Sequence, residues 1–583
     1  MDRVVELPED LPDGRALVAE GRRIGESTPV GVSAFCEAHG VTNEVEFRAS
    51  QAAEGEFTWS TIMGLSSIDE EIEGLRFLDR MGRETGFPIH RALIIPNWLT
   101  GIPPEVRDKA PRGTSFILDG LEDHVRLAQA APIHPCFIDH HIGAPHCVNN
   151  TAAAIQAGGT YHGVFADFAN EYPLAKDAVK HISETIKAVG VVAAKRDDFM
   201  VVDSYIEDSI AAHFLDHVST VGYAMIEKYI VDGLCGARYA NGIGGLITDM
   251  LTKLSVCLAL YEVTCADHPS VSYYYGSTLA PSDKHLVQNY GVIASEYALM
   301  AALERRYHMG LALLPTPITE KVEVPTKEGI ADARMVAGRA ADRSSGVDKV
   351  IDWGVIEAHK DMLVEHGKDF FANALRMFEE SGVDVRDPLQ MCLALRLLGA
   401  EKLESLCHPG ERDPSRPNGI VPFMPTELPL MADEAVGMEL AAIKAKGLAG
   451  AVEGRTFLVA SADTHWFGAY AVKAVLTKLG AQVIDIGPER DPQQVVAAAE
   501  REDWPAIMVS LHNGQCAPYG EQLMTTLAES GARCPVYFGG KLNGIRQGDT
   551  EPSDMSDDLR KMGIIPCMSV AEMVEVVAGG ASP

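Results

Sequence analysis

The chain has 583 residues, 46% hydrophobic and 23% charged, which allows two or more domains with large cores. Its formal net charge of −32 argues against partners such as nucleic acid or an anionic membrane surface, because phosphates would be repelled. The chain has no long uncharged apolar run, the start "MDRVVELPEDLPDG" lacks a signal pattern, and the 11 cysteines form no CxxC pair. We therefore expect a cytoplasmic protein with reduced thiols, a small-molecule substrate and a homodimeric assembly.

After an N-terminal segment (residues 1–49), residues 50–330 alternate between apolar strands and helical stretches such as "IDEEIEGLRFLDRMG". This alternation predicts an α/β fold, specifically a (β/α)8 TIM-like barrel with its active site at the carboxyl ends of the strands. Polar residues near those ends, Asp119, His140, Asp167 and Asn241, are candidates for the barrel mouth. The candidate strands are residues 60–66, 90–98, 114–120, 134–141, 161–169, 199–205, 237–242, 270–277 and 311–317.

The segment "FIDHHIGAPH" places several titratable side chains at one expected strand end. Histidines can donate hydrogen bonds to a substrate or act as general acids and bases near neutral pH, and they could also bind a second metal. The alternative is that one of the pair only packs and satisfies backbone groups. We assign catalytic roles to His140 and His141 and substrate contacts to Asp139 and His146. Arg238 occupies a comparable location, and "SYYYG" either lines an aromatic wall or packs as an ordinary strand.

Residues 331–407 are expected to form a helical extension, and residues 408–452 a linker that is rich in proline at its start and contains a helical segment near 432–450. Residues 453–583 then alternate regularly, with Asp491 as the N-cap of a helix that begins at Pro492. Wholly apolar strands separated by helices predict a flavodoxin-like doubly wound sheet. Its five strands are expected at residues 456–462, 481–487, 506–511, 535–540 and 564–568.

The stretch "SADTHWFGAY" carries a D-x-H-x-x-G pattern directly after the first of these strands. Alone, the pattern fits a strand-end histidine beside an acid as well as it fits a metal ligand. Its distance to two further motifs decides between them: residues 469–509 separate Gly468 from Ser510, and residues 513–538 separate His512 from the pair Gly539-Gly540. With these spacings, residues from about 454 to the end resemble the cobalamin-binding domain of adenosylcobalamin mutases and methionine synthase.

The resemblance implies a role for each residue of the motif. His465 would be the lower ligand of cobalt, and Asp463 would accept its other ring N–H, with Thr464 between them. Gly468 would allow a tight turn, Ser510 would hydrogen-bond near the buried base of the cofactor, and Gly539-Gly540 would let the backbone approach the nucleotide tail. One departure is His512, which stands where the family has the leucine of S-x-L.

The barrel region resembles the large subunit of glutamate mutase, in order but patchily, from about residue 50 to 340. The similar segments include "SSIDEEIEGLRFLDRMG" (66–82), "AAAIQAGGTYHG" (152–163) and "LPTPITEKVEVPTKEGIADARMVAG" (313–337). Barrel and cobalamin domain are separate chains in that family but fused in methyleneglutarate mutase, as here. The resemblance implies adenosylcobalamin as the cofactor and a ribose contact from Lys327 in P-T-K-E, although Lys327 could also be a surface lysine in a loop.

The substrate grip of glutamate mutase is missing from this chain. The positions that correspond to the three substrate-binding arginines of glutamate mutase are occupied by Ile62, by a residue near Ser115, and by a residue within "IDHHIGAPH", which has no arginine. Val164 stands where glutamate mutase has the acidic residue that pairs with the substrate amine. Glu171 lies nearby in the sequence and is a candidate substrate contact. The sequence therefore predicts an adenosylcobalamin-dependent radical isomerase for a small substrate other than glutamate. A corrinoid methyltransferase, or a cobalamin carrier or sensor without mutase activity, is the alternative.

Overall fold

The computed structural model describes residues 4–109, 115–172, 174–266, 272–282, 284–320, 324–413, 417–462, 466–487, 490–511, 515–544 and 553–579. The chain folds into two compact units, which are described separately. The first contains Met1–Pro103, Ser115–Ala169 and Asp177–Glu427. The second contains Pro104–Thr114, Asn170–Lys176 and Leu428–Pro583.

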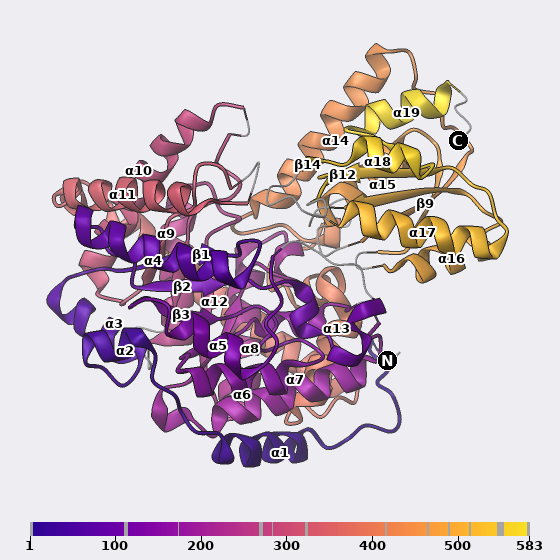
Figure 1. Cartoon of the computed structure of the whole chain (residues 1–583). Helices are drawn as coiled ribbons and strands as arrows, with labels where there is room; N and C mark the ends of the chain where they lie inside the picture. The colour runs from indigo at the N-terminus through magenta and orange to yellow at the C-terminus, as the bar shows by residue number, and fades with distance from the viewer. Residues whose placement is uncertain are drawn as a thin grey trace. The chain divides into compact units, whose positions relative to one another are not determined.

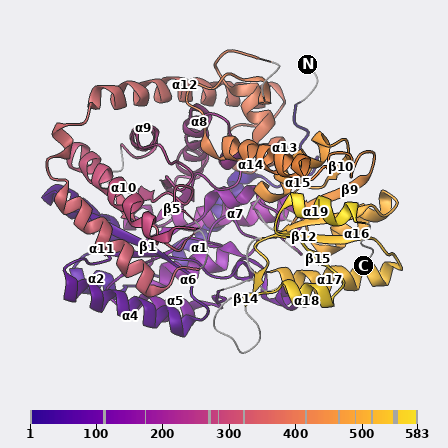
Figure 2. The ribbon, with the colours of Figure 1, turned by 90° about the horizontal axis from the view of Figure 1, so that it is seen from above.

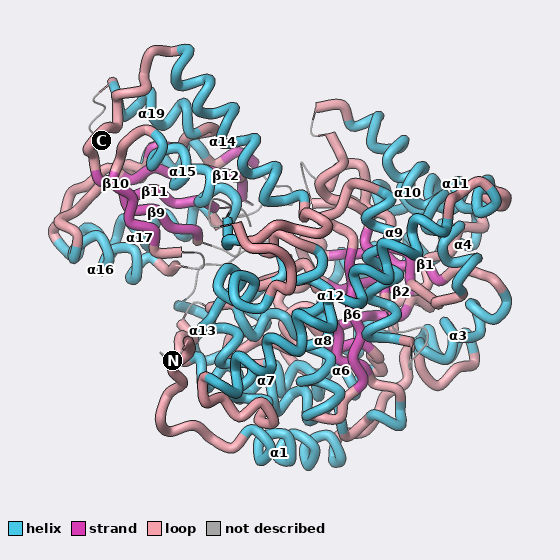
Figure 3. The backbone as a smooth tube through the Cα atoms, turned by 180° about the vertical axis from the view of Figure 1, so that it is seen from behind, coloured by secondary structure: helices cyan, strands magenta, loops and turns pink. Residues whose placement is uncertain are grey.

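Eight parallel strands in sequence order close the first unit into a TIM-like barrel, which confirms the predicted fold. Figures 1 and 3 show these strands inside a surrounding layer of helices. The strands are β1 (Thr58–Met63), β2 (Arg91–Ile94), β3 (His134–Phe137), β4 (Tyr161–His162), β5 (Val201–Tyr205), β6 (Arg238–Ile243), β7 (Tyr273–Tyr275) and β8 (Ala312–Leu314).

Eight of the nine predicted strands therefore exist, and the prediction for 114–120 is wrong within the described residues 115–120. Phe116 and Leu118 are buried, 3% and 0% exposed, as a strand pattern would require. However, they pack with α4 (Ile68–Thr85) and α5 (Leu121–Ala128) outside the barrel. The Leu118 N–H donates to Thr100 Oγ1 at 3.1 Å instead of to a neighbouring strand. The alternating apolar residues of this segment therefore belong to a loop that packs against the helices and not to a strand.

Helices cover the outside of the barrel, as Figure 2 shows from above. Their ends follow local chemistry: α4 begins after Ser67, whose side chain accepts from the Glu70 N–H, and ends at Gly86 with φ 77°. The other helices are α1 (Gly14–Ser27), α2 (Ala34–His39), α3 (Glu44–Glu54), α6 (Cys147–Ala157), α7 (Ala178–Ala193), α8 (His217–Lys228), α9 (Met250–Leu260), α10 (Leu286–Tyr307), α11 (Lys327–Arg343), α12 (Trp353–Glu380) and α13 (Pro388–Cys407).

The amino end of the barrel is closed by α3. Arg48, fully buried, donates from Nε to the Gly310 carbonyl at 3.1 Å and from Nη1 to the Tyr161 hydroxyl at 2.6 Å. Its Nε lies 3.7 Å from Glu44 Oε1, and Arg91 Nε lies 3.8 Å from the same oxygen. The end of the N-terminal segment thus packs into the amino end of the barrel.

The second unit is a five-stranded parallel sheet in the order β10-β9-β11-β12-β15, the order of flavodoxin-like folds. One face packs against α16, α17 and α18, and the other against α14, α15 and α19. Asp491 caps α16 in a capping box with Gln494, as its sequence predicts. The strands are β9 (Thr456–Ser461), β10 (Gln482–Asp485), β11 (Ala506–Leu511), β12 (Val536–Gly540) and β15 (Ile565–Pro566), and β13 (Asn543–Gly544) pairs with β14 (Ser553–Asp554).

The helices of this unit are α14 (Glu427–Ala445), α15 (Trp466–Lys478), α16 (Pro492–Arg501), α17 (Cys516–Ser530), α18 (Ser556–Lys561) and α19 (Val570–Ala578). The first of them, α14, lies inside the region expected to link the two domains. Across the described parts of both units, we find no helix with the length and apolar character needed to cross a membrane.

Candidate functional site

The carboxyl end of β3 leads into the loop that carries the predicted catalytic residues. Asp139 and His140 are half-buried there, and His140 has a φ of 66°, in the left-handed region. Burial lowers the pKa of His140 to about 4, so its imidazole is neutral. Burial, with the nearby Asp203 carboxylate, raises the pKa of Asp139 to about 7. Asn150 holds the loop by donating to the Thr100 and His140 carbonyls at 2.9 and 3.0 Å.

His141 lies in a different environment from His140. It is 0% exposed, its Nε2 lies 2.7 Å from Nε2 of His124, and its Nδ1 lies 2.8 Å from the Asp139 carbonyl oxygen. Its ring also packs 5.4 Å from that of Phe137, in the layer between β3 and α5. The structure therefore does not bring His141 to the mouth, which argues against its expected catalytic role. Across the described residues, no three His, Cys, Asp or Glu side chains are grouped to hold a metal ion.

The other predicted substrate contacts are dispersed. His146 precedes α6 and lies at the same end of the barrel as Asp139. Arg238, by contrast, begins β6 at the amino end, where it donates to the Arg196 carbonyl at 3.0 Å and covers the Phe199 ring. Glu171 belongs to the second unit, where it is paired with Arg490 and lies 3.6 Å from Lys176 Nζ. Arg238 is therefore not at the same end of the barrel as Asp139, and the expected substrate contact of Glu171 stays a prediction.

Lys327 is the first residue of α11, directly after its N-cap Thr326. Its ammonium lies 5.7 Å from the centre of the Phe77 ring, on α4. Asn241, expected at the mouth, instead points outward: its side chain donates to Thr264 Oγ1 at 2.7 Å and is 1% exposed. Since inward and outward side chains alternate along a barrel strand, its neighbours Ala240 and Gly242 take the inward positions.

Sequence reasoning missed Asp203, an acid within the apolar strand β5. Asp203 is 0% exposed, and burial raises the pKa of its carboxyl to about 7 despite the opposing effect of Arg91. Its inward neighbours along β5 are Val201 and Tyr205, which pack in the barrel core with Tyr273 and Tyr275. Two tyrosines of the run, Tyr273 and Tyr275, thus line the barrel interior, whereas the Tyr274 hydroxyl donates to Glu296 on α10. The sequence did contain a signal for Asp203: a charged residue stands in the apolar run "VVDSY", and buried strands rarely contain a charged residue without a specific reason.

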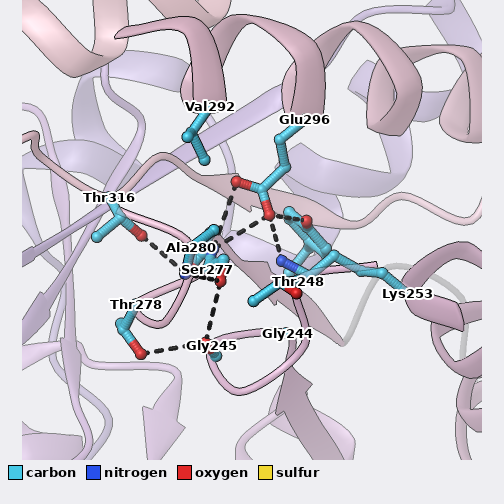
Figure 4. A network of polar contacts seen from close by, with 12 residues as sticks. Gly244, Gly245, Thr248, Lys253, Ser277, Thr278, Ala280, Val292, Glu296 and Thr316 are labelled. Atoms are coloured by element: carbon cyan, nitrogen blue, oxygen red, sulfur yellow. Dashed lines mark hydrogen bonds and ion pairs between the residues drawn. The ribbon is translucent and has the colours of Figure 1, made fainter. Parts of the chain in front are cut away.

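A buried polar network fixes the loops at the mouth (Figure 4). Glu296 on α10 accepts from Lys253 on α9, from the Tyr274 hydroxyl at 2.5 Å and from the Ser277 N–H at 3.1 Å. Thr278 and Thr316 extend the network by donating to the carbonyls of Gly245, at 3.1 Å, and Gly276, at 2.8 Å. The segments that follow β6, β7 and β8 are therefore tied together. Such ties hold side chains at the mouth in one arrangement.

In the second unit, the carboxyl edge of the sheet gathers the motif residues. Ser510 on β11 is in register with Ser461 on β9 and with Gly539 on β12. The Ala462 N–H donates to the Ser510 carbonyl at 2.9 Å, so the two strands end side by side. Because β10 lies on one side of β9 and β11 on the other, this edge is the switch point where doubly wound sheets bind ligands.

A cavity of about 230 Å³ opens beside this edge. Its walls come from β9, β11, β12, α14, α15 and the segment at the start of α19. Gly468, Ser510, Gly539 and Gly540 all line it, so the structure brings together the four described motif residues. Apolar walls with a few polar groups are typical of a small-molecule pocket. The other lining residues include Val459, Phe467, Val472, Met508, Tyr537 and Met573.

Residues 456–557 match the sequence model of the B12 binding domain. The match covers most of the second unit, and it supports cobalamin as the cofactor of that unit. A comparison with curated proteins finds no match. Among solved structures, a methanol:cobalamin methyltransferase complex from Methanosarcina barkeri is 15% identical, over 52% of this chain and 83% of that chain, with a TM-score of 0.19. At that score the two chains do not superpose, so this likeness carries no weight for the reaction.

Two glycines limit what can occupy the walls of the cavity. A Cβ at position 468 would lie 2.4 Å from Ser510 Oγ, so a side chain larger than a methyl group there would extend into the cavity. Gly540 has a φ of 98°, and a Cβ there would lie 2.1 Å from the Leu511 carbonyl oxygen, so position 540 requires glycine. The predicted Asp463, Thr464 and His465, as well as His512, lie outside the described residues.

Proposed function

We propose that the protein is an adenosylcobalamin-dependent radical isomerase that acts on a small organic substrate other than glutamate. The observation that carries this proposal is the presence, in one chain, of a B12-binding domain with a cavity at its switch point and a barrel with buried acids and tyrosines at its mouth. The resemblance of the barrel sequence to glutamate mutase, which includes the P-T-K-E motif, favours isomerisation over methyl transfer.

In this proposal, residues of the second unit would bind the cofactor and residues of the barrel would bind the substrate. When bound, adenosylcobalamin would supply radical chemistry for the isomerisation. His465 would ligate cobalt, and Asp463 would orient that histidine. Gly468, Ser510 and Gly540 would receive the nucleotide tail. At the barrel mouth, Asp139 and Asp203 would bind the substrate, and the tyrosine wall would keep water away from the reacting groups.

Cofactor preference and paramagnetic resonance test the proposal. We expect the purified protein loaded with adenosylcobalamin to give, with its substrate from a panel of small molecules, a signal from cobalt coupled to an organic radical. Stoichiometric loss of methyl from bound methylcobalamin would instead identify a methyltransferase and overturn the proposal. Tight binding of both cofactors without turnover on any compound of the panel would favour a carrier or sensor.

His465 gives a direct test of the cobalt ligand. In His465→Ala the lower face would carry water or the base of the cofactor itself, so we expect a changed visible spectrum. Affinity should fall by more than the roughly 10–100-fold that loss of an outer-shell partner such as Asp463 costs. His512→Ala, a histidine in the adjacent motif, is the matched control and should keep both spectrum and affinity. An unchanged spectrum in His465→Ala would show that the ligand assignment is wrong.

A further inference from the structure

Part of the wall of the 230 Å³ cavity lies outside the segment that matches the B12 binding domain, residues 456–557. Ala435 and Glu439 line the cavity from α14, which precedes that segment. Residues 567–570 and Met573 line it from the start of α19, which follows that segment. In Figures 1 and 3 the helices α14 and α19 lie side by side. Two flanking helices therefore complete a cavity that the matched segment does not enclose by itself.

Apolar packing fixes the position of α14 on the sheet. Val436 and Ile443 are 0% exposed and belong to the cluster that covers β9 and α19. Residues three and four apart share one face of a helix, so Glu439 lies on the same side as these two, and Ala435 lies one turn before it. Met438, by contrast, is 69% exposed. The packed side of α14 thus directs Ala435 and Glu439 to the cavity.

Hydrogen bonds tie α14 to a helix on each of its sides. The Tyr470 hydroxyl on α15 donates to Asp433 Oδ1 at 2.8 Å. The Ala571 N–H, in the first turn of α19, donates to Glu439 Oε2 at 2.7 Å. The first N–H groups of a helix have no partner within that helix, so Glu439 satisfies a donor that α19 cannot satisfy itself. Glu439 therefore both lines the cavity and holds the start of α19, which is another of its walls.

We propose that α14 is a wall of the cofactor site, where Ala435 leaves room for the nucleotide tail of cobalamin and Glu439 holds α19 against that tail. This inference deepens the proposed function and rests on cobalamin being the cofactor of the second unit. Met508 and Met573 line the same cavity, and thioethers pack favourably against aromatic rings such as the base in that tail. A segment outside the matched domain thus contributes to retention of the cofactor.

Cobinamide, a corrinoid without the nucleotide tail, separates tail contacts from all other contacts of the cofactor. In Ala435→Phe the aromatic ring would extend into the cavity, so we expect the affinity for cobalamin to fall at least about tenfold. The affinity for cobinamide should stay the same. Equilibrium titration of the full-length protein, followed by the visible spectrum, measures both affinities. An unchanged affinity for cobalamin in folded Ala435→Phe, or an equal loss for both corrinoids, would overturn the proposal.

Met438→Phe is the matched control, because it places the same ring on the same helix at a position that is 69% exposed. It should keep the affinity of the natural protein for both corrinoids. A loss as large as that of Ala435→Phe would mean that any bulky residue on α14 weakens binding, which contradicts the proposal. Thermal unfolding without cofactor shows whether each variant is folded. If Ala435→Phe is not, the smaller change Ala435→Leu takes its place with the same expected direction.

Glu439→Ala tests the link between α14 and α19. Without an acceptor for the Ala571 N–H, the start of α19 is held less firmly, so bound cobalamin should dissociate at least about threefold faster. Cobinamide should dissociate at an unchanged rate. Glu439→Gln keeps an oxygen acceptor and should restore the natural rate for cobalamin. Equal cobalamin dissociation from Glu439→Ala and the natural protein would show that Glu439 does not retain the tail. These experiments follow binding and not turnover, so their result is independent of whether the isomerase signal is found.

Discussion

Gly468→Leu should abolish cobalamin binding, with a loss of at least about 100-fold, or about 2.7 kcal/mol. Even a Cβ at this position would lie 2.4 Å from Ser510 Oγ, and the branched end of leucine would extend into the 230 Å³ cavity. A single methyl can be accommodated by rotation of the Ser510 hydroxyl, so Gly468→Ala should lose much less. Equilibrium titration with cobalamin, followed by the visible spectrum, measures the difference.

Gly437→Leu is the control for this substitution. It also replaces a helical glycine in the second unit, but a Cβ at 437 meets no atom within 4 Å. Its cobalamin affinity should equal that of the natural protein. Thermal unfolding of the cobalamin-free proteins separates a blocked cavity from a damaged fold. If folded Gly468→Leu still binds cobalamin tightly, the cavity does not hold the tail.

Lys253→Met should lower the free energy of unfolding by about 3–5 kcal/mol. Lys253 is 0% exposed and Glu296 only 5%, so removing the ammonium leaves a carboxylate buried without its charge partner. Glu296 also accepts from Tyr274 and Ser277, so an uncompensated charge there disturbs the segment after β7 (Figure 4). Urea unfolding, followed by circular dichroism, measures the loss.

The double variant Lys253→Met/Glu296→Gln shows whether the cost is electrostatic. A neutral amide can still accept from Tyr274 and Ser277, and we expect it to recover part of the stability lost in Lys253→Met. Lys360→Met is a control for loss of an exposed pair, because its partner Glu262 is 44% exposed; it should cost at most about 1 kcal/mol. A loss in Lys253→Met no larger than that in Lys360→Met would show that the buried pair contributes little.

Most of the fold can be predicted from patterns along the chain. Eight barrel strands and the five strands of the second sheet lie where apolar runs alternate with helices, because parallel strands buried on both faces need such runs. The wrong prediction of a strand at residues 114–120 arises from the same reliance on apolar patterns. Phe116 and Leu118 alternate as strand residues do, and only their packing against the helix layer distinguishes a loop from a strand.

The motif residues Gly468, Ser510, Gly539 and Gly540 could be predicted because their spacing resembles that of cobalamin-binding domains, and the structure places all four on one cavity. The barrel site could not. His140 and His141 are neighbours in sequence, but the left-handed backbone at His140 lets His141 turn away to pair with His124. Asp139 follows β3 and Asp203 lies on β5, and the sequence did not show that the two carboxyl groups interact, because that depends on how β3, β4 and β5 lie side by side.

The sequence by itself determined the barrel and a domain that resembles cobalamin-binding domains, because strand periodicity and motif spacing are local properties of the chain. Only the tertiary structure decided which polar side chains share the barrel interior. That choice depends on the register of neighbouring strands, which sets Asp203 of β5 beside Ala240 of β6. Of the two histidines expected to be catalytic, the structure leaves His140 half-buried after β3 and buries His141 against His124.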